Sequence, residues 1–596
     1  MSELPVEIFR LVFGLLSHDK KFLHSCLLVN RTWRESVVSI LWRDPFKFLQ
    51  KPSAQLIQTY ISCMDEAGRK NLEGLGINFE NEPLCRPTFD YVGFLRHLKY
   101  TDFYYSSRAW LEEILGQQKN LDFAGFLVTK ELFKFFMNQC QTILSLEINT
   151  EHLYPPDDAD YVSIPCFPGA PKCLSQLQDF VCCGNYNKKG IFKEMTQSCR
   201  NIRTLSVDYF LDEFKTAAPS ELARLIKNQH ALVEFKLIVC YRFLSKIIPA
   251  LESQKKTLTN VEFRGIRFEN GVTFEALVAC TSLESLTFFN CDNVTDQASD
   301  PLSTAFFPKL RKIVFNVLHT PPKALAALIC NNSVTLQDLS LEWPPLNDSQ
   351  SDPQIIEKII EQCPNIIKFE AHLKTSQLLS LLGKCSLLED LTVRGREPLF
   401  ADGFLPQLGQ MAPPKLRVLN ICAIWSFSPE SLQQFLDHCT APLEYIGLRE
   451  CYAMNDEHLD VLTQYAEKGT LKHLNVKAAT RITREGLENA LRVISHVDHS
   501  LKEEREEPLV NAENENEIVE TEESSENDEN AKTEAENLQA EESSEVTTRI
   551  TNEYGAIGQV DQNLKEDGNE SLEDAEVERE TIKTEKSSEN GENKPC

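Results

Sequence analysis

The chain has 596 residues and a formal net charge of −28, so it is too long for one ordinary globular core. Residues 501–596 hold 31 acidic and 9 basic residues, which leaves a net charge of only −6 for the first 500. A nearly balanced body with an acidic end argues against binding to nucleic acid or to membranes, and no stretch reaches the 18 apolar residues of a membrane span.

Residues 1–44 have the pattern of three short helices. Pro5 suits the first turn of a helix, and Ile8, Val12 and Leu16 recur at helical spacing. Asn30 can cap the third helix. The segment carries more large apolar residues than three small helices can bury among themselves, so a docking partner is expected.

The same segment resembles the F-box family in the order and spacing of its residues. The matching positions are Leu4, Pro5, Glu7, Ile8, Phe13, Leu16, Leu23, Cys26, Val29, Trp33, Leu41 and Trp42. The resemblance implies binding to a Skp-type adaptor and through it to a cullin. It also implies that Leu4, Pro5, Ile8, Val12 and Leu16 lie at or near the adaptor contact. A plain helical cap on the residues that follow is the alternative.

The body of the chain, residues 72–500, repeats the template L-x-x-L-x-L. Between Leu232 and Leu471 the step is about 22 to 30 residues, which is the leucine-rich-repeat period. Amphipathic helical stretches lie between the copies, so we expect an α/β solenoid, with residues 45–71 as a linker helix. The copies before residue 200 are degenerate. Clear copies begin at Leu283, Leu310, Leu336, Leu388, Leu416, Leu443 and Leu471.

Nineteen cysteines occur, but the N-terminal residues lack the basic region of a secretory signal. We therefore expect reduced thiols and a location in the cytoplasm and/or nucleus. Eight cysteines lie at one of two fixed offsets from the first apolar position of a template copy, five of them three residues before it and three of them eight residues after it. This placement predicts small buried hydrophobic residues rather than metal ligands. The spacing is similar to that of the cysteine-containing class of leucine-rich repeats. These residues are Cys140, Cys199, Cys240, Cys280, Cys291, Cys363, Cys385 and Cys451.

Residues 501–596 are rich in Glu, Asn, Ser and Lys, with Tyr554 as the one aromatic residue. Low hydrophobicity and high net charge predict a disordered acidic tail. Ser525 and Ser571 are followed by acidic residues, so they are candidate phosphorylation sites. A purely solubilising tail is the alternative interpretation.

A target is expected on the strand face of the solenoid, where alternate residues point outward. One column of such positions runs Asp208, Ile238, Arg264, Phe289, Asn316, Glu342, His372, Arg394, Cys422, Arg449 and Lys477. His372, Arg394, Arg449 and Lys477 would form a basic ladder for an acidic or phosphorylated segment of a target. There are two alternatives. The ladder is a solvated charge pattern without a ligand, or the chain's own acidic tail occupies it.

No phosphate-binding loop, nucleophile elbow or HExxH helix occurs, and the histidines show no ligand spacing along the chain. We therefore expect no catalytic residue, no metal site and no cofactor. The function predicted from these features is the substrate-recognition subunit of a Skp–cullin–F-box ubiquitin ligase. A leucine-rich-repeat scaffold that does not promote degradation is the main alternative, and a Ran-type GTPase-activating protein is a weaker one.

Overall fold

The computed structural model divides the chain into two units, Met1–Glu503 and Glu504–Cys596. The predicted acidic tail, with Ser525 and Ser571, lies outside the described residues, and so do Leu4 and Pro5. The residues that the structure describes are 6–74, 87–116, 121–150, 153, 162–184, 186, 188–208, 218–318, 323–342 and 353–500.

Three helices open the described chain, as the sequence predicts: α1 (Val6–Leu15), α2 (Lys20–Leu27) and α3 (Arg31–Leu41). The predicted cap at Asn30 is confirmed, because its side chain accepts a hydrogen bond from the Trp33 backbone N–H at 2.9 Å. A small core of its own holds the three helices together, built from Phe13, Leu23, Cys26 and Val37.

The next helices are α4 (Ala54–Cys63), α5 (Glu66–Glu73) and α6 (Tyr91–Phe94). The stretch that the sequence assigns to one linker helix therefore holds α4 and most of α5. Helix α4 buries Tyr60 against Phe103 and Phe136, so it packs into the same core as the repeats.

In the part of the chain that the structure describes, the repeats form a single parallel sheet of fifteen strands, in which each strand is hydrogen-bonded to its neighbours in the sequence. The strands are β1 (His97–Lys99), β2 (Ser145–Asn149), β3 (Asp179–Cys183), β4 (Thr204–Asp208), β5 (Glu234–Ile238), β6 (Asn260–Arg264), β7 (Ser285–Cys291), β8 (Lys312–Val317), β9 (Asp338–Glu342), β10 (Lys368–His372), β11 (Asp390–Phe400), β12 (Val418–Ser426), β13 (Tyr445–Leu448), β14 (His473–Asn475) and β15 (His496–Asp498).

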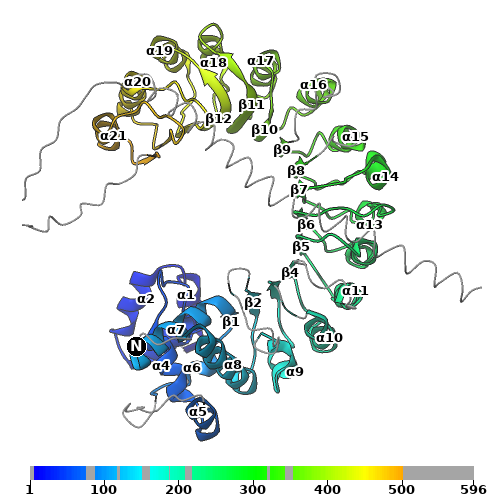
Figure 1. Ribbon diagram of the computed structural model, residues 1–596, viewed down its shortest axis with the longest axis vertical. Coiled ribbons are helices and arrows are strands. Elements are labelled where there is room, and N and C mark those ends of the chain that lie inside the picture. Colours follow the sequence, from blue (N-terminus) through cyan, green and yellow to red (C-terminus); the bar gives the residue numbers. More distant parts are fainter. Residues whose placement is uncertain are drawn as a thin grey trace, which may run out of the picture. The chain divides into compact units, whose positions relative to one another are not determined.

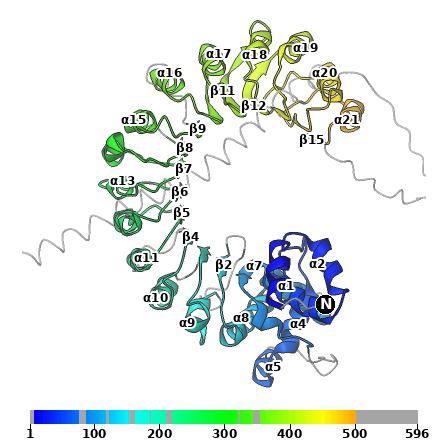
Figure 2. The same cartoon turned by 180° about the vertical axis from the view of Figure 1, so that it is seen from behind.

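Helices or short helical turns connect the strands. Figures 1 and 2 show the strands along the inner edge of a curved array and the helices along its outer edge. The connecting elements are α7 (Tyr100–Leu115), α8 (Leu121–Gln139), η2 (Ile164–Cys166), α9 (Ala170–Cys173), α10 (Lys188–Ser198), α11 (Ala218–Lys227), α12 (Leu244–Ile247), η3 (Ile248–Gln254), α13 (Glu275–Val278), α14 (Asp296–Ser299), η4 (Asp300–Thr304), α15 (Ala324–Asn331), α16 (Pro353–Gln362), α17 (Thr375–Lys384), α18 (Leu405–Met411), α19 (Pro429–His438), α20 (Asp456–Glu467) and α21 (Arg484–Leu491).

The solenoid follows directly from the template. In β7, Leu286 and Phe288 are buried, whereas Ser285 and Thr287 are half-buried on the inner face. Successive residues of a strand point to opposite sides, so the template leucines fill the core and the residues between them face outward. No repeat buries its apolar side alone, and stacking therefore makes the array cooperative. The predicted α/β solenoid is confirmed. Among the described helices, none is long and apolar enough to cross a membrane.

Buried amide side chains hold neighbouring repeats together at the turns before the strands, which the sequence did not indicate. Gln254 donates hydrogen bonds to the carbonyls of Ile226 and Gln229 at 2.9 and 3.0 Å and accepts one from the Leu232 N–H. Asn332 likewise donates hydrogen bonds to the carbonyls of Ala305 and Leu328 and accepts one from the Phe307 N–H. Each amide satisfies backbone groups that the turn would otherwise bury without partners.

Candidate protein-binding surfaces

Helix α1 presents an apolar face to solvent. Ile8, Leu11, Val12 and Leu15 are 41%, 67%, 45% and 79% exposed. Because a helix turns once every 3.6 residues, these positions form one stripe, which we call the α1 stripe. Two exposed apolar residues, Leu28 and Val29, follow helix α2. A cluster of exposed large apolar side chains of this kind marks an interaction surface.

The opposite side of α1 explains why this face is left open. Phe13 is buried and contacts Trp33 of α3 edge-on, with ring centroids 5.1 Å apart. Phe9 packs on the same two rings at 6.0 and 5.7 Å. The aromatic residues thus occupy the side of α1 that faces α3, and the aliphatic residues are left on the solvent side.

The structure places only part of the predicted adaptor contact on the α1 stripe. Ile8 and Val12 belong to it, whereas Leu16 follows the end of the helix and is half-buried. Leu11 and Leu15 are the most exposed members, although the sequence prediction did not include them. The signal for them was their helical spacing. Leu11 lies three residues after Ile8, and Leu15 lies three residues after Val12 and four after Leu11.

The end of the three-helix segment is bonded to the start of the solenoid. The carbonyl of Arg43 accepts hydrogen bonds from the backbone N–H groups of Arg96 and His97, both at 3.0 Å. Trp42 packs on Tyr91 with ring centroids 4.0 Å apart and meets Tyr60 edge-on at 5.5 Å. Direct contacts, rather than a free linker, therefore connect α3 to the first strand.

The inner face of the sheet aligns the residues that the sequence placed in one column. The strand registers pair Asp208 with Ile238, Ile238 with Arg264, and Arg264 with Phe289. Further along, His372 pairs with Arg394, and Arg394 pairs with Cys422. The stacking of the column is therefore confirmed over these strands.

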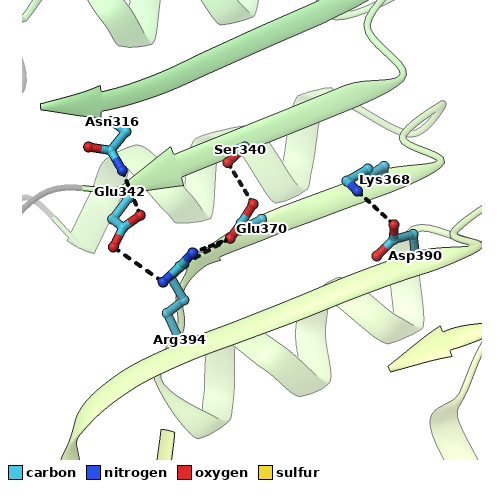
Figure 3. Close-up of polar contacts among 7 residues, drawn as sticks. All are labelled: Asn316, Ser340, Glu342, Lys368, Glu370, Asp390 and Arg394. Atoms are coloured by element: carbon cyan, nitrogen blue, oxygen red, sulfur yellow. Dashed lines mark hydrogen bonds and ion pairs between the residues drawn. The ribbon is translucent and has the colours of Figure 1, made fainter. Parts of the chain in front are cut away.

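Arg394 is not an isolated cation on this face (Figure 3). Its guanidinium contacts Glu370 at 2.7 Å and Glu342 at 3.3 Å, on the two preceding strands. Glu342 also accepts a hydrogen bond from Asn316, and Glu370 accepts one from Ser340. Burial alone would lower the pKa of Arg394, but the two glutamates outweigh burial and raise it. The charge of Arg394 is thus balanced within the sheet.

A neighbouring column alternates in charge along β8 to β11. Lys312 pairs with Asp338 at 2.9 Å, and Lys368 pairs with Asp390 at 2.8 Å. The hydrogen bond to Asp390 raises the pKa of Lys368. Because each strand carries the opposite charge to its neighbour, this part of the face is also internally balanced.

Arg449 and Lys477 lie just beyond the ends of β13 and β14, and both are exposed. Burial raises the pKa of the Cys422 thiol, while Arg394 and Arg449 oppose that shift. Both guanidinium groups therefore lie near Cys422. Among the residues that the structure describes, neither Arg449 nor Lys477 forms an ion pair, so these two are the exposed cations of the predicted ladder.

The middle of the inner face is hollowed over β4 to β10, with a cavity of about 640 Å³. Phe289 lines this hollow with about a third of its surface exposed, and the Arg264 guanidinium lies over its ring at 4.4 Å. Arginine and aromatic side chains are enriched among the residues that anchor a bound protein partner. The sequence placed both residues in the column but assigned them no role.

The cysteines behave as the sequence predicts, because all eight that lie at the two fixed offsets are buried. Burial raises the pKa of the thiols of Cys363 and Cys385 to about 12 and about 11. The thiolate is the reactive form, so these residues are unreactive at neutral pH and serve as small core residues.

Comparison with known protein families identifies one domain at the N-terminal end of the chain. The family described as F-box-like matches residues 1–47, so the chain carries an F-box-like domain on helices α1 to α3, followed by a leucine-rich-repeat solenoid. No curated protein is detectably similar to the chain in sequence.

Several solved structures match the chain at low identity. A chain of the Rad7 and Elc1 complex in yeast is 16% identical, with a TM-score of 0.33 over 47% of this chain and 72% of that one. An internalin (inlF) from Listeria monocytogenes is 12% identical, with a TM-score of 0.31 over 62% and 89%. The plant peptide hormone receptor RGFR1 is 11% identical, with a TM-score of 0.28 over 62% and 63%. These scores are too low to support an argument, and the fold rests on the strand order.

Proposed function

We propose that this protein is the substrate-recognition subunit of a Skp–cullin–F-box ubiquitin ligase, acting in the cytoplasm and/or nucleus. The α1 stripe docks on the Skp-type adaptor, which connects the chain to a cullin, and the inner face of the solenoid holds the target. The observation that carries the proposal is an F-box-like domain whose α1 leaves Leu11 and Leu15 largely exposed. Each such leucine, once covered by a partner, contributes about 1.5–3 kcal/mol.

The proposed activity needs no catalytic residue in this chain. A receptor of this kind accelerates ubiquitin transfer by holding the target beside the charged conjugating enzyme. The hydrogen bonds from Arg96 and His97 to the Arg43 carbonyl support such a role, because they connect the adaptor-binding helices directly to the target-binding sheet.

The double variant Leu11→Asp/Leu15→Asp is expected to abolish binding to the Skp-type adaptor. Two buried anchor residues of about 2 kcal/mol each correspond to roughly a 1000-fold loss of affinity. Binding is measured by co-purification and by calorimetry with the purified adaptor. Both residues are largely exposed, so the thermal midpoint of the variant should match that of the native chain.

The matched control is Val334→Asp, which places the same charge at a residue of the solenoid that is 78% exposed. This variant should bind the adaptor as the native chain does. If Leu11→Asp/Leu15→Asp retains native affinity, or if the native chain does not bind the adaptor, residues 1–47 serve only as a cap on the repeats and the proposal fails.

We further propose that the target surface is the C-terminal part of the column, formed by His372, Arg394, Arg449 and Lys477, and that it takes an acidic or phosphorylated segment. Arg449 and Lys477 supply the exposed charge. Arg394 is held by Glu342 and Glu370, so its role is to position neighbouring groups.

The double variant Arg449→Glu/Lys477→Glu tests this surface with a library of acidic and phosphoserine peptides. Selected peptides should bind the native chain in a salt-dependent manner and bind the variant at least about tenfold more weakly, because attraction becomes repulsion. The control is Arg492→Glu, a reversal at an exposed residue that follows α21. If the peptides bind Arg449→Glu/Lys477→Glu as tightly as Arg492→Glu, the target binds elsewhere. The hollow around Phe289 is then the next surface to test.

A further inference from the structure

Three side chains with metal-ligand chemistry meet at the last two strands. His473 begins β14, and His496 and Asp498 begin and end β15. The register pairs His473 with His496 and Asn475 with Asp498. One ligand atom from each of His473, His496 and Asp498 lies within 4.8 Å of the other two. In the described residues this is the one such group.

The two imidazoles share a single carboxylate. Nε2 of His473 lies 3.0 Å from Oδ2 of Asp498, and Nε2 of His496 lies 3.3 Å from Oδ1 of the same residue. A tetrahedral zinc ion with Zn–N and Zn–O bonds of about 2.0–2.2 Å holds its ligand atoms about 3.3–3.5 Å apart. Each of the two N···O separations lies within a few tenths of an ångström of that spacing, although the two imidazoles face different oxygens of Asp498.

Neighbouring residues hold the three groups in place. Asn475 is buried, and its side-chain N–H donates a hydrogen bond to Oδ2 of Asp498 at 3.2 Å. The ring of Tyr445 packs on His473 with centroids 4.8 Å apart. The rings of His473 and His496 are nearly perpendicular, at 78°, so both Nε2 atoms can approach the same carboxylate. Outer contacts of this kind orient metal ligands.

We propose that His473, His496 and Asp498 form a binding site for a divalent transition metal of the zinc type. Two imidazole nitrogens and one carboxylate are the ligand set that zinc accepts when a fourth position stays open for water or for an added ligand. Asp498 and His473 keep about a quarter and a third of their side-chain surface exposed, so an ion can enter from solvent. The inference does not depend on the ligase proposal, because it rests on β14 and β15 alone.

A purely structural network is the competing interpretation. Both imidazoles can instead donate Nε2–H hydrogen bonds to Asp498, and no ion is then needed. The two interpretations differ in one measurable property. A zinc ion requires the lone pair of each Nε2, so it displaces both hydrogen bonds and forms one complex of defined stoichiometry, whereas the network binds zinc no better than scattered surface histidines do.

The experiment is a calorimetric titration of the full chain with Zn²⁺, after treatment with a chelator. Mg²⁺, which prefers oxygen ligands, is the control metal. The variants are His473→Gln, His496→Gln and Asp498→Asn. His438→Gln is the control, because His438 is an exposed histidine on α19 outside the cluster. The native chain and the control should bind one Zn²⁺, and each of the three ligand variants should bind at least about 100-fold more weakly.

Two further readouts separate a lost site from a lost fold. Zn²⁺ should raise the thermal midpoint of the native chain and of His438→Gln but leave the ligand variants unchanged, because only bound metal stabilises the folded state. Co²⁺ should give the visible absorption of a tetrahedral ion in the native chain and in His438→Gln, but not in the three ligand variants. The proposal is overturned if the native chain binds no Zn²⁺, or if the three ligand variants bind it as the control does.

Discussion

The variant Lys188→Met is expected to lower the free energy of unfolding by about 3–5 kcal/mol. Lys188 and Asp208 form an ion pair at 3.0 Å with side chains only 2% and 5% exposed. Methionine fills a similar volume but leaves the Asp208 carboxylate without its partner in the interior. Urea unfolding followed by circular dichroism measures the change.

The contacts around this pair explain why the loss should be large. The ammonium of Lys188 also donates a hydrogen bond to the Gly184 carbonyl at 2.5 Å and lies 4.9 Å from the Tyr186 ring. Asp208 accepts a bifurcated hydrogen bond from the single Gly184 N–H, with N···O distances of 3.0 Å to Oδ1 and 2.9 Å to Oδ2. The pair thus joins Gly184, which follows β3, and the first residue of α10 to the end of β4.

Two variants make the result specific. Lys193→Met removes the same charge from an exposed lysine of α10 and should change stability by less than about 0.5 kcal/mol. Lys188→Met/Asp208→Leu removes both charges and should recover much of the loss, because apolar pairs of similar volume replace buried ion pairs well. Equal effects of Lys188→Met and Lys193→Met would show that the buried pair does not contribute to stability.

The variant Phe288→Ala is expected to destabilise the middle of the solenoid by about 3–5 kcal/mol. Phe288 is almost fully buried on β7, and its ring lies 5.4 Å from that of Phe263, 5.2 Å from Phe274 and 5.3 Å from Phe315. Truncation removes apolar burial, leaves a cavity and breaks ring contacts on both sides. Urea unfolding should show an earlier midpoint.

The control for this variant is Phe306→Ala, at a residue that is 62% exposed, where the change should stay within about 0.5 kcal/mol. Because each repeat is stabilised by its neighbours, the loss at Phe288 should extend to adjacent strands. Hydrogen exchange should therefore quicken in β6 and β8 as well as in β7. Exchange that quickens only in β7 would contradict this coupling.

The sequence by itself determined the parts of the fold that depend on local periodicity. The L-x-x-L-x-L template predicted the parallel strands, because alternate burial along a strand is set by its period of two. The start of α3 was predicted from Asn30, whose side chain caps the helix by accepting a hydrogen bond from a backbone N–H three residues away. The burial of the eight cysteines was predicted from their two fixed offsets within the repeats. These inferences needed no knowledge of which repeats touch.

The tertiary structure alone decided which side chains meet across repeats. Arg394 appeared as a free cation until the fold placed Glu370 and Glu342 on the strands beside it. Asp208 was assigned to an open column, yet Lys188, the first residue of α10, forms a buried ion pair with it. The reason is that such partners are twenty or more residues apart in sequence, beyond the reach of any local pattern.

The same reason governs both candidate sites. On α1, the packing of Phe13 against Trp33 decided that Leu11 and Leu15 face solvent, although periodicity alone allowed a stripe ending at Leu16. At the other end, His473 and His496 show no ligand spacing in sequence, and only the register of β14 and β15 brings them together. The periodicity of the sequence determined the helices and strands and which of their sides are buried. The stacking of the repeats determined which exposed side chains meet, and therefore which contacts and sites they form.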